Sequence, residues 1–250
     1  MHKTGEFVWF ECVTPDTEKA KAFYTEVIGW KVEDMPMGDA TYDLIKVGDA
    51  GVGGFMKPQA DGVLAHWLTY LSVADVDAAA KRVVASGGKT VSDAVDIPDV
   101  GRMQVVSDPH GGTLSLFRSA HGDPDKDPVA GTWHWNELWS QDADASLKFY
   151  SETFDLGTET MEMPEGPYHM LQVGGKPAAG LMRAPDRKIP TMWMPYVIVD
   201  DVEATISRAK QHDGKVLSGD KVIEVPGVGA FAHLQDPTGA ILGIIKPAER

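Results

Sequence analysis

The feature that most constrains the fold of this chain is an internal duplication that runs through almost its whole length. Residues 126 positions apart match in one register from Trp9 and Trp135 as far as Gly88 and Gly214. After a two-residue insertion the spacing becomes 128 and continues to Asp108 and Asp236. Other matched pairs are Glu11/Glu137, Phe23/Phe149, Tyr24/Tyr150, Tyr42/Tyr168, Gly54/Gly180, Trp67/Trp193, Tyr70/Tyr196 and Arg82/Arg208. A register held this long indicates two homologous domains.

The duplication predicts domains at residues 1–118 and 132–250, with a linker at 119–131 between them. From Ser119 to Thr132 the chain reads SAHGDPDKDPVAGT. This string is rich in Gly, Pro and Asp and has no apolar periodicity, which is typical of a linker.

Each domain repeats the same order of elements twice. In the first module we expect strands at 7–13, 42–47 and 52–56, and a helix at about 17–27 that begins after Asp16 and ends at Gly29. In the second we expect strands at 67–73, 89–91, 102–106 and 113–118, and a helix at about 76–86. The pattern predicts an α+β fold of four βαβββ modules, at about 6–58, 65–118, 132–185 and 191–247.

Composition limits the partners and the compartment. The chain has 23 basic and 37 acidic residues, a net charge of −14, so it repels nucleic-acid phosphates and we expect no nucleic-acid binding. No apolar run approaches the roughly 18 to 20 residues that span a bilayer, so we expect no membrane insertion. The single cysteine, Cys12, and a start without an apolar signal core favour the cytoplasm. The acidity serves solubility or favours cationic or neutral ligands, and charge alone does not separate the two.

Three motifs resemble the vicinal oxygen chelate superfamily, which includes glyoxalase I, bleomycin-resistance proteins and extradiol dioxygenases. They are D-x6-F-Y-x4-G-W at 16–30, V-x-D-V-D-A at 73–78, and the D-P-x-G turns at 108–111 and 236–239. The resemblance covers nearly the whole chain outside the linker and is strongest to tandem two-domain bacterial proteins. It implies two glyoxalase-like domains whose cupped, mixed sheets hold the active site.

The metal positions of that family carry no plausible divalent-metal ligands here. Mapped by the resemblance onto this sequence, they fall at Trp9, Leu68, Ser115 and near Gly54 in the first copy, and at Trp135, Met194, Gly243 and near Gly180 in the second. Serine is the nearest to a ligand among them, and a weak one. We therefore expect no cofactor, and a divalent metal only at a site other than the family's.

Strand alternation indicates what faces each cup. Residues two apart in a strand share a face, so Trp9 and Glu11 point one way in the first copy. Trp135, Glu137 and Trp139 likewise share one face in the second copy. Tyr70 and Tyr196 lie two residues after Leu68 and Met194, the mapped ligand positions, so they also face the cup. Glu11 and Glu137 are the candidate catalytic residues, because desolvation raises the pKa of a carboxyl group and suits it to acid or base work. The alternative is that each glutamate pairs with an Arg or Tyr and only orients the modules.

The candidate ligand-binding residues each have a structural alternative. Trp9, Trp135 and Trp139 either stack on a planar ligand or fill the space that a metal site left. Tyr70 and Tyr196 either donate a hydroxyl to a ligand or are half-buried strand residues. His169 and His233 occur only in the second copy, opposite Asp43 and Val105 of the first. If both converge near Glu137 they form a displaced metal site, and otherwise they are solitary histidines.

These residues support two functions of different classes. The first is a small-molecule binding protein of the bleomycin-resistance kind, which holds an apolar or cationic ligand between aromatic residues and the two glutamates. The second is a lyase or isomerase related to lactoylglutathione lyase, or another enzyme, that uses Glu11 or Glu137 as its acid or base. The aromatic and acidic cup faces argue against a third, a protein–protein module with vestigial cups. A covalent tandem completes its own cups, so we expect a monomer or weak dimer.

Overall fold

The computed structural model describes residues 1–37, 40–125, 127–163, 166–219 and 221–248. Its helices are α1 (Thr17–Ile28), α2 (Val76–Ala85), α3 (Ala143–Phe154) and α4 (Val202–Gln211). The strands of the first repeat are β1 (Phe7–Val13), β2 (Lys31–Met37), β3 (Ala40–Val47), β4 (Ala50–Met56), β5 (His66–Ser72), β6 (Lys89–Thr90), β7 (Val95–Ile97), β8 (Gly101–Ser107) and β9 (Thr113–Ser119). Those of the second are β10 (Trp133–Ser140), β11 (Gly157–Met163), β12 (Gly166–Val173), β13 (Lys176–Arg183), β14 (Met192–Ile198), β15 (Lys215–Val216), β16 (Ile223–Val225), β17 (Gly229–Gln235) and β18 (Ile241–Pro247).

The strands form one mixed, curled sheet in each repeat. The orders are β2-β3-β4-β1-β5-β9-β8-β6 and β11-β12-β13-β10-β14-β18-β17-β15, with β7 paired to β8 and β16 to β17. In the first sheet β1 runs parallel to β4, whereas β2 and β3 are antiparallel. The second sheet repeats this arrangement with β10, β13, β11 and β12. These sheets confirm the predicted α+β fold of βαβββ modules.

The helices begin where their capping residues predict. The carboxylates of Asp16, Asp75, Asp142 and Asp201 each accept the backbone N–H three residues further on, which satisfies one unpaired donor of the first turn. Helix α1 ends at Gly29, whose φ of 86° is left-handed, as the sequence predicts. At the same point after α3 stands Asp155, with a φ of 55°.

Four strands went unpredicted: the outer strands β2 and β11 and the short strands β7 and β16. Strands β2 and β11 read KVEDMPM and GTETMEM, and all their residues are exposed or half-buried. Each is the first strand of its sheet order and pairs with a single neighbour. A strand exposed on both faces carries no apolar alternation, so its sequence gives no strand signal.

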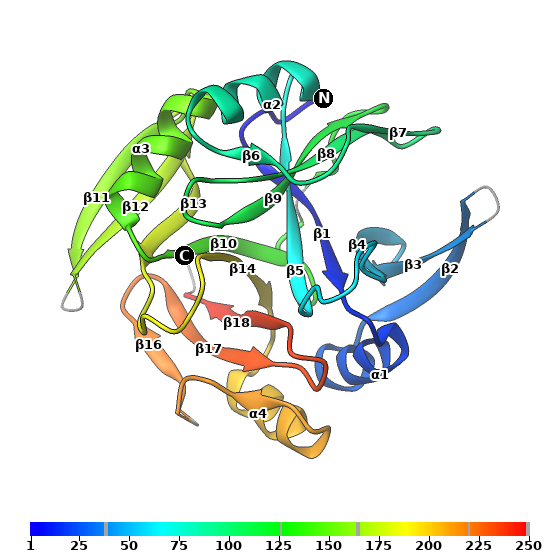
Figure 1. Ribbon diagram of the computed structural model, residues 1–250. Helices are drawn as coiled ribbons and strands as arrows, with labels where there is room; N and C mark the ends of the chain where they lie inside the picture. The colour runs from blue at the N-terminus through cyan, green and yellow to red at the C-terminus, as the bar shows by residue number, and fades with distance from the viewer. Residues whose placement is uncertain (38–39, 126, 164–165, 220, 249–250) are drawn as a thin grey trace. The chain divides into compact units, whose positions relative to one another are not determined.

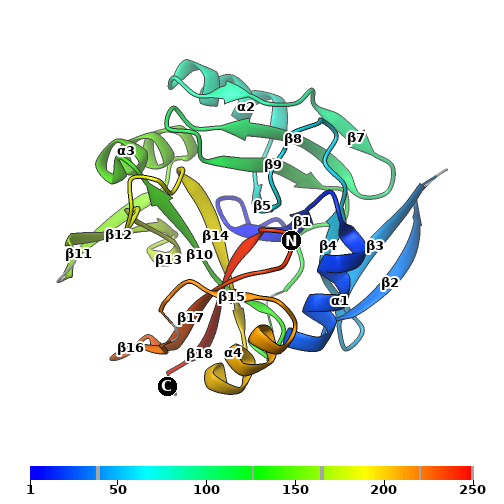
Figure 2. The ribbon, with the colours of Figure 1, turned by 60° about the horizontal axis from the view of Figure 1, so that its bottom comes forward.

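Packing divides the chain into two compact units, and each unit takes residues from both repeats. Unit 1 consists of Met1–Trp9, Leu68–Asp125 and Trp135–Met194, and unit 2 of Phe10–Trp67, Lys126–His134 and Pro195–Arg250. Within unit 1, helix α2 contacts α3, and within unit 2, α1 contacts α4 (Figures 1 and 2). The sheets and the compact units divide the chain differently, so the predicted domain boundaries stay a prediction.

Two of the sequence motifs meet in the core of unit 1. The hydroxyl of Tyr150 on α3 donates to Asp108 Oδ2 at 2.9 Å and accepts the indole N–H of Trp193 at 3.0 Å. The other oxygen of Asp108 accepts the backbone N–H groups of His110 and Gly112 in its own turn. Burial and the Asp108 carboxylate raise the pKa of Tyr150 well above its usual value. The D-P-x-G turn of one repeat therefore holds the F-Y helix of the other.

Unit 2 has the matching arrangement with the repeats exchanged. Trp67 donates its indole N–H to the hydroxyl of Tyr24 at 3.0 Å, and Asp236 lies beside that hydroxyl. Burial and the Asp236 charge raise the pKa of Tyr24 well above its usual value. The guanidinium of Arg208 on α4 donates to the backbone carbonyl of Val27 near the end of α1. A cation at this position satisfies a terminal carbonyl and complements the helix dipole.

The segment between the repeats also makes specific contacts. Asp123 is buried in unit 1, where its carboxylate accepts from Ser72 and from the backbone N–H of Lys3, both at 2.6 Å. In unit 2 the carbonyl of Gly131 accepts the indole N–H of Trp30 at 2.7 Å. Helices long and apolar enough to cross a membrane are absent from the described residues.

Candidate functional site

A chain of hydrogen bonds surrounds Glu137 on β10. Trp139 donates its indole N–H to Glu137 Oε1 at 2.7 Å, and the Tyr168 hydroxyl donates to Oε2 at 2.8 Å. Trp135 donates its indole N–H to the Tyr168 hydroxyl at 2.9 Å. Trp135, Glu137 and Trp139 therefore share one face of the strand, as alternation predicts. We call these three residues and Tyr168 the Glu137 cluster.

Gly180 makes room for this cluster. It lies opposite Glu137 in the parallel ladder between β10 and β13. A Cβ atom at this position would overlap the Tyr168 hydroxyl and lie 2.8 Å from Nε1 of Trp135. Glu137 is 6% exposed, and burial together with its charge raises the pKa of Tyr168 well above the usual value.

The first repeat has a related but smaller arrangement around Glu11 on β1. The Tyr42 hydroxyl donates to Glu11 Oε1 at 2.7 Å, and Glu11 is also 6% exposed. Gly54 lies opposite Glu11 in the ladder, and a Cβ there would overlap the Tyr42 hydroxyl. The position of Trp139 is occupied by Val13, which has no side-chain donor.

Tyr42 and Tyr168 are the functional candidates that the sequence analysis did not single out. The signal was present, because each keeps the spacing of 126 and each is accompanied by a matched glycine, Gly54 or Gly180. The contact itself depends on the pairing of β3 with β4 and of β12 with β13. A strand register of this kind is not visible in a list of matched residues.

The other two candidate tyrosines have different partners. The hydroxyl of Tyr196 and Nε2 of His233 form a hydrogen bond of 2.9 Å in unit 2, and Phe231 packs edge-on against Tyr196. Burial lowers the pKa of His233 to about 4, so the imidazole is neutral near pH 7. In unit 1 the Tyr70 hydroxyl donates to the sulfur of Met103 at 3.7 Å. Trp9 is half-buried in β1.

His169 lies on the opposite face of its sheet from Glu137. The ladders pair Leu138 with Leu181 and Leu181 with His169, so these three share the face that Glu137 does not. There Nδ1 of His169 bonds to Thr160 Oγ1 at 2.9 Å, and Nε2 lies 3.4 Å from Asp144 on α3. The structure does not bring His169 beside Glu137.

The residues at the family's metal positions do not fit a divalent cation. Near Gly54 and Gly180 the space for a ligand side chain is filled by the tyrosine hydroxyls, and at Gly243 it is filled by the ring of Tyr196. The other positions hold Trp, Leu, Met or Ser, none of which is a strong ligand. Within the described part of the chain, no group of three or more His, Cys, Asp or Glu side chains could hold a metal ion.

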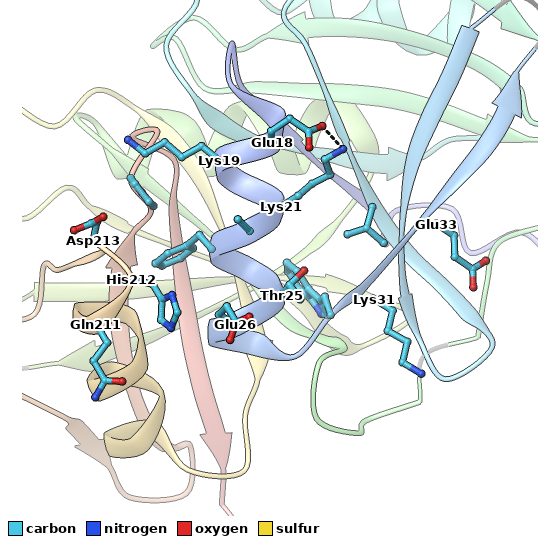
Figure 3. A pocket seen from close by; sticks show the side chains of 15 residues that line it. Glu18, Lys19, Lys21, Thr25, Glu26, Lys31, Glu33, Gln211, His212 and Asp213 are labelled. Carbon is cyan, nitrogen blue, oxygen red and sulfur yellow. Dashed lines mark ion pairs between the residues drawn. The ribbon is translucent and has the colours of Figure 1, made fainter.

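Unit 2 also contains an open cavity of about 830 Å³ beside α1 (Figure 3). Charged side chains from α1 and β2 surround it, including Lys21, Lys31 and Glu33, together with His212 and Asp213 after α4. Lys21 and Glu18 form an ion pair at its rim. None of the described residues that line this cavity is a predicted site residue, and its mixed charges favour no ligand class.

Comparisons with known proteins agree on one family. A sequence model of the Glyoxalase/Bleomycin resistance protein/Dioxygenase superfamily matches residues 6–116. A Mycobacterium tuberculosis protein named "Putative glyoxylase CFP32" is 35% identical over 254 residues, which cover 99% of this chain and 97% of that protein. The anthracycline biosynthesis protein DauV of Streptomyces sp. strain C5 is 27% identical over 278 residues, covering 98% and 94%.

A solved glyoxalase structure has a similar fold. The crystal structure of an Mn(II)-bound glyoxalase from Novosphingobium aromaticivorans superposes with a TM-score of 0.69 at 18% identity. The match covers 100% of this chain and 85% of that one. At this level of identity the likeness concerns the fold, and the chemistry has to be argued from the residues themselves.

Proposed function

Because the chain belongs to the glyoxalase/bleomycin resistance protein/dioxygenase superfamily, we propose that it binds a small organic molecule against the aromatic and acidic faces of its sheets. The observation that carries the proposal is the Glu137 cluster. Its glutamate, 6% exposed, is fixed by two side-chain donors among tryptophan and tyrosine rings. Aromatic walls with a few placed polar groups are the usual composition of a small-molecule site.

The two repeats contribute unequally to this function. Glu11 with Tyr42 offers the same carboxylate and hydroxyl as Glu137 with Tyr168. The second repeat adds the indole N–H of Trp139 beside its carboxylate. We place the principal ligand contacts at Glu137, Trp135 and Trp139, with Tyr196 and His233 as further contacts, and a second, simpler set at Glu11, Trp9 and Tyr70.

The test is a ligand screen by thermal unfolding followed by titration calorimetry. A ligand present at about 100 times its Kd stabilises the folded protein by about 2.7 kcal/mol, which is readily seen as a rise in Tm. We expect aromatic compounds to raise the Tm of the wild type, and Glu137→Gln to reduce that rise more than Glu11→Gln does. If no aromatic compound raises the Tm, the binding proposal is wrong.

A second candidate function is a lyase or isomerase in which Glu11 or Glu137 transfers a proton. It is favoured by the buried, hydrogen-bonded state of both carboxylates, since such groups are common general bases. The named glyoxylase relative makes methylglyoxal with glutathione the first substrate pair to assay. Turnover by the wild type that disappears in Glu137→Gln supports this candidate. A wild-type rate no higher than that of the uncatalysed reaction removes the glyoxalase assignment. Stoichiometric Zn, Ni, Mn or Fe in purified protein would reveal a metal site outside the family positions.

We further propose that the chain acts in the cytoplasm as a monomer or weak dimer, without nucleic-acid or membrane partners. The net charge of −14 supports the exclusion of polyanions. Sedimentation analysis tests the oligomeric state, and a tight dimer at micromolar concentration would contradict it.

A further inference from the structure

We propose that Trp139 and Tyr168 make Glu137 an obligate hydrogen-bond acceptor, so that the second repeat selects ligands that donate a hydrogen bond, above all protonated amines. This inference rests on the proposed binding function and names the ligand chemistry of the same site. It makes Trp139 a specificity-determining residue, because the first repeat has Val13 at the matched position.

The directions of these three hydrogen bonds of the Glu137 cluster follow from the chemistry of its members. An indole N–H can only donate, so Trp135 donates to the Tyr168 oxygen and Trp139 donates to Glu137 Oε1. With its oxygen accepting from Trp135, Tyr168 directs its own proton to Glu137 Oε2. Both carboxylate oxygens therefore accept, and neither bond requires a proton on the glutamate.

The surrounding structure fixes these directions. Trp139 is 4% exposed and sits two residues from Glu137 on the same strand face, so its ring has little room to turn. Tyr168 lies over Gly180, where any larger residue would displace it. The Glu137 carboxylate held by these donors is therefore already oriented before a ligand arrives. This reduces the loss of side-chain entropy on binding.

The chemistry of the cluster then defines the ligand. A carboxylate attracts a protonated amine and repels a carboxylate or phosphate. The faces of indole and phenol rings add a cation–π attraction for the same cation. Val13 has no side-chain N–H, so the first repeat offers no indole donor at the position of Trp139. We therefore expect weaker discrimination between ligand charges in the first repeat.

The test uses three probes that share one ring system and differ in charge: tryptamine (a cation), tryptophol (neutral) and indoleacetate (an anion). Calorimetric titration of the wild type should give a Kd for tryptamine at least about tenfold lower than for indoleacetate. Glu137→Gln should bring the two values to within about twofold, and Trp139→Phe should reduce the ratio about fivefold. Asp144→Asn removes an exposed charge on α3 and should leave the ratio unchanged.

A measurement without ligand tests the hydrogen bond itself. In isotope-edited NMR of the free protein, the indole N–H of Trp139 should resonate downfield and exchange slowly with solvent. Glu137→Gln should shift this signal, and Asp144→Asn should not. A solvent-like Trp139 signal in the wild type would overturn the inference whatever the probes do.

The outcomes separate the inference from the binding proposal. Equal affinity for tryptamine and indoleacetate would overturn the selectivity and leave the binding function standing. A ratio that survives Trp139→Phe would remove the role of Trp139. Absence of binding by all three probes would count against both the binding function for aromatic compounds and the selectivity derived from it.

Discussion

Glu11 of the first repeat accepts a hydrogen bond from Tyr42, whereas Glu137 of the second accepts from Tyr168 and also from Trp139. The two glutamates occupy the same place in their ladders, opposite Gly54 and Gly180. The strand pairing at the two glutamates is thus the same, and the side chain two residues further on differs, Val13 against Trp139. A fold of this kind keeps its framework while its sites change by one residue at a time.

The second repeat is the more polar of the two at matched positions. At three of them an apolar residue of the first repeat corresponds to one with a polar side-chain group in the second: Val13 to Trp139, Val105 to His233 and Phe10 to Asn136. A buried polar group destabilises a fold unless a partner satisfies it. Trp139 and His233 have hydrogen-bond partners, whereas both polar atoms of the Asn136 side chain lack one within the described structure. The polar substitutions are therefore not equivalent.

The largest effect on stability is expected at the two glycines. Gly180→Ala should lower the free energy of unfolding by about 3 kcal/mol, because its Cβ displaces Tyr168 and presses on Trp135. Gly54→Ala should cost about 2 kcal/mol, since its nearest contacts are all with Tyr42. Urea denaturation of both variants measures the difference. A larger loss at Gly54 would show that the first repeat depends more on its tyrosine.

His233 should make stability depend on pH in a way that the first repeat does not. Its pKa is lowered to about 4 in the folded protein, so the unfolded chain binds a proton more readily as the pH falls below about 6.5. The stability held above that pH is lost on acidification, by about 2 kcal/mol between pH 7 and pH 5. His233→Val, which restores the residue of the first repeat, should remove this part of the pH slope. An identical slope in both proteins would contradict the prediction.

Asn136 should be replaceable with a gain in stability. Its amide is 1% exposed and has no hydrogen-bond partner among the described residues. Asn136→Leu keeps the volume and removes the unsatisfied group, so we expect a gain of about 1 kcal/mol in the free energy of unfolding. Asn136→Asp is the matched control and should lower it, because it buries a charge. A loss in the leucine variant would point to a buried water that the amide binds.

The smallest effect is expected at the charged pairs that join a helix to a neighbouring strand. In the first repeat Lys21 on α1 lies 3.1 Å from Asp43, and in the second Asp144 on α3 lies 3.4 Å from His169. Lys21→Met should cost about 0.5 kcal/mol and Asp144→Asn less, because Asp144 is largely exposed. Unfolding at low and at high salt measures both. The loss in free energy of unfolding caused by Lys21→Met should be smaller in high salt, because salt screens the ion pair. A loss that is the same in high salt would mean that packing of the lysine stem matters more than its charge.

Much of the fold could be predicted because the duplication doubles each signal. Capping residues such as Asp16 and the apolar periodicity of α1 locate the helices, and the buried strands β1 and β5 begin and end within a residue of their predicted limits. The outer strands β2 and β11 could not be found, since strands exposed on both faces show no alternation. The assignment of modules to compact units also depends on long-range packing that no local pattern records.

The candidate site could be predicted only along single strands. Alternation places Trp135, Glu137 and Trp139 on one face, and the bond between Trp139 and Glu137 joins them there. Tyr168 reaches the cluster through ladder pairing between three strands, which the sequence does not state. The same pairing puts His169 on the far face, so its relation to Glu137 also depends on register.

Because each compact unit takes one module from each repeat, cutting the backbone within residues 119–131 would not separate the repeats. Each fragment would own half of both cores, and contacts such as that between Tyr150 and Asp108 would still join the two pieces. A single repeat made alone would present two incomplete cores to solvent. The two repeats are therefore not independently folding domains. A truncation at the boundary between them would remove part of both compact units.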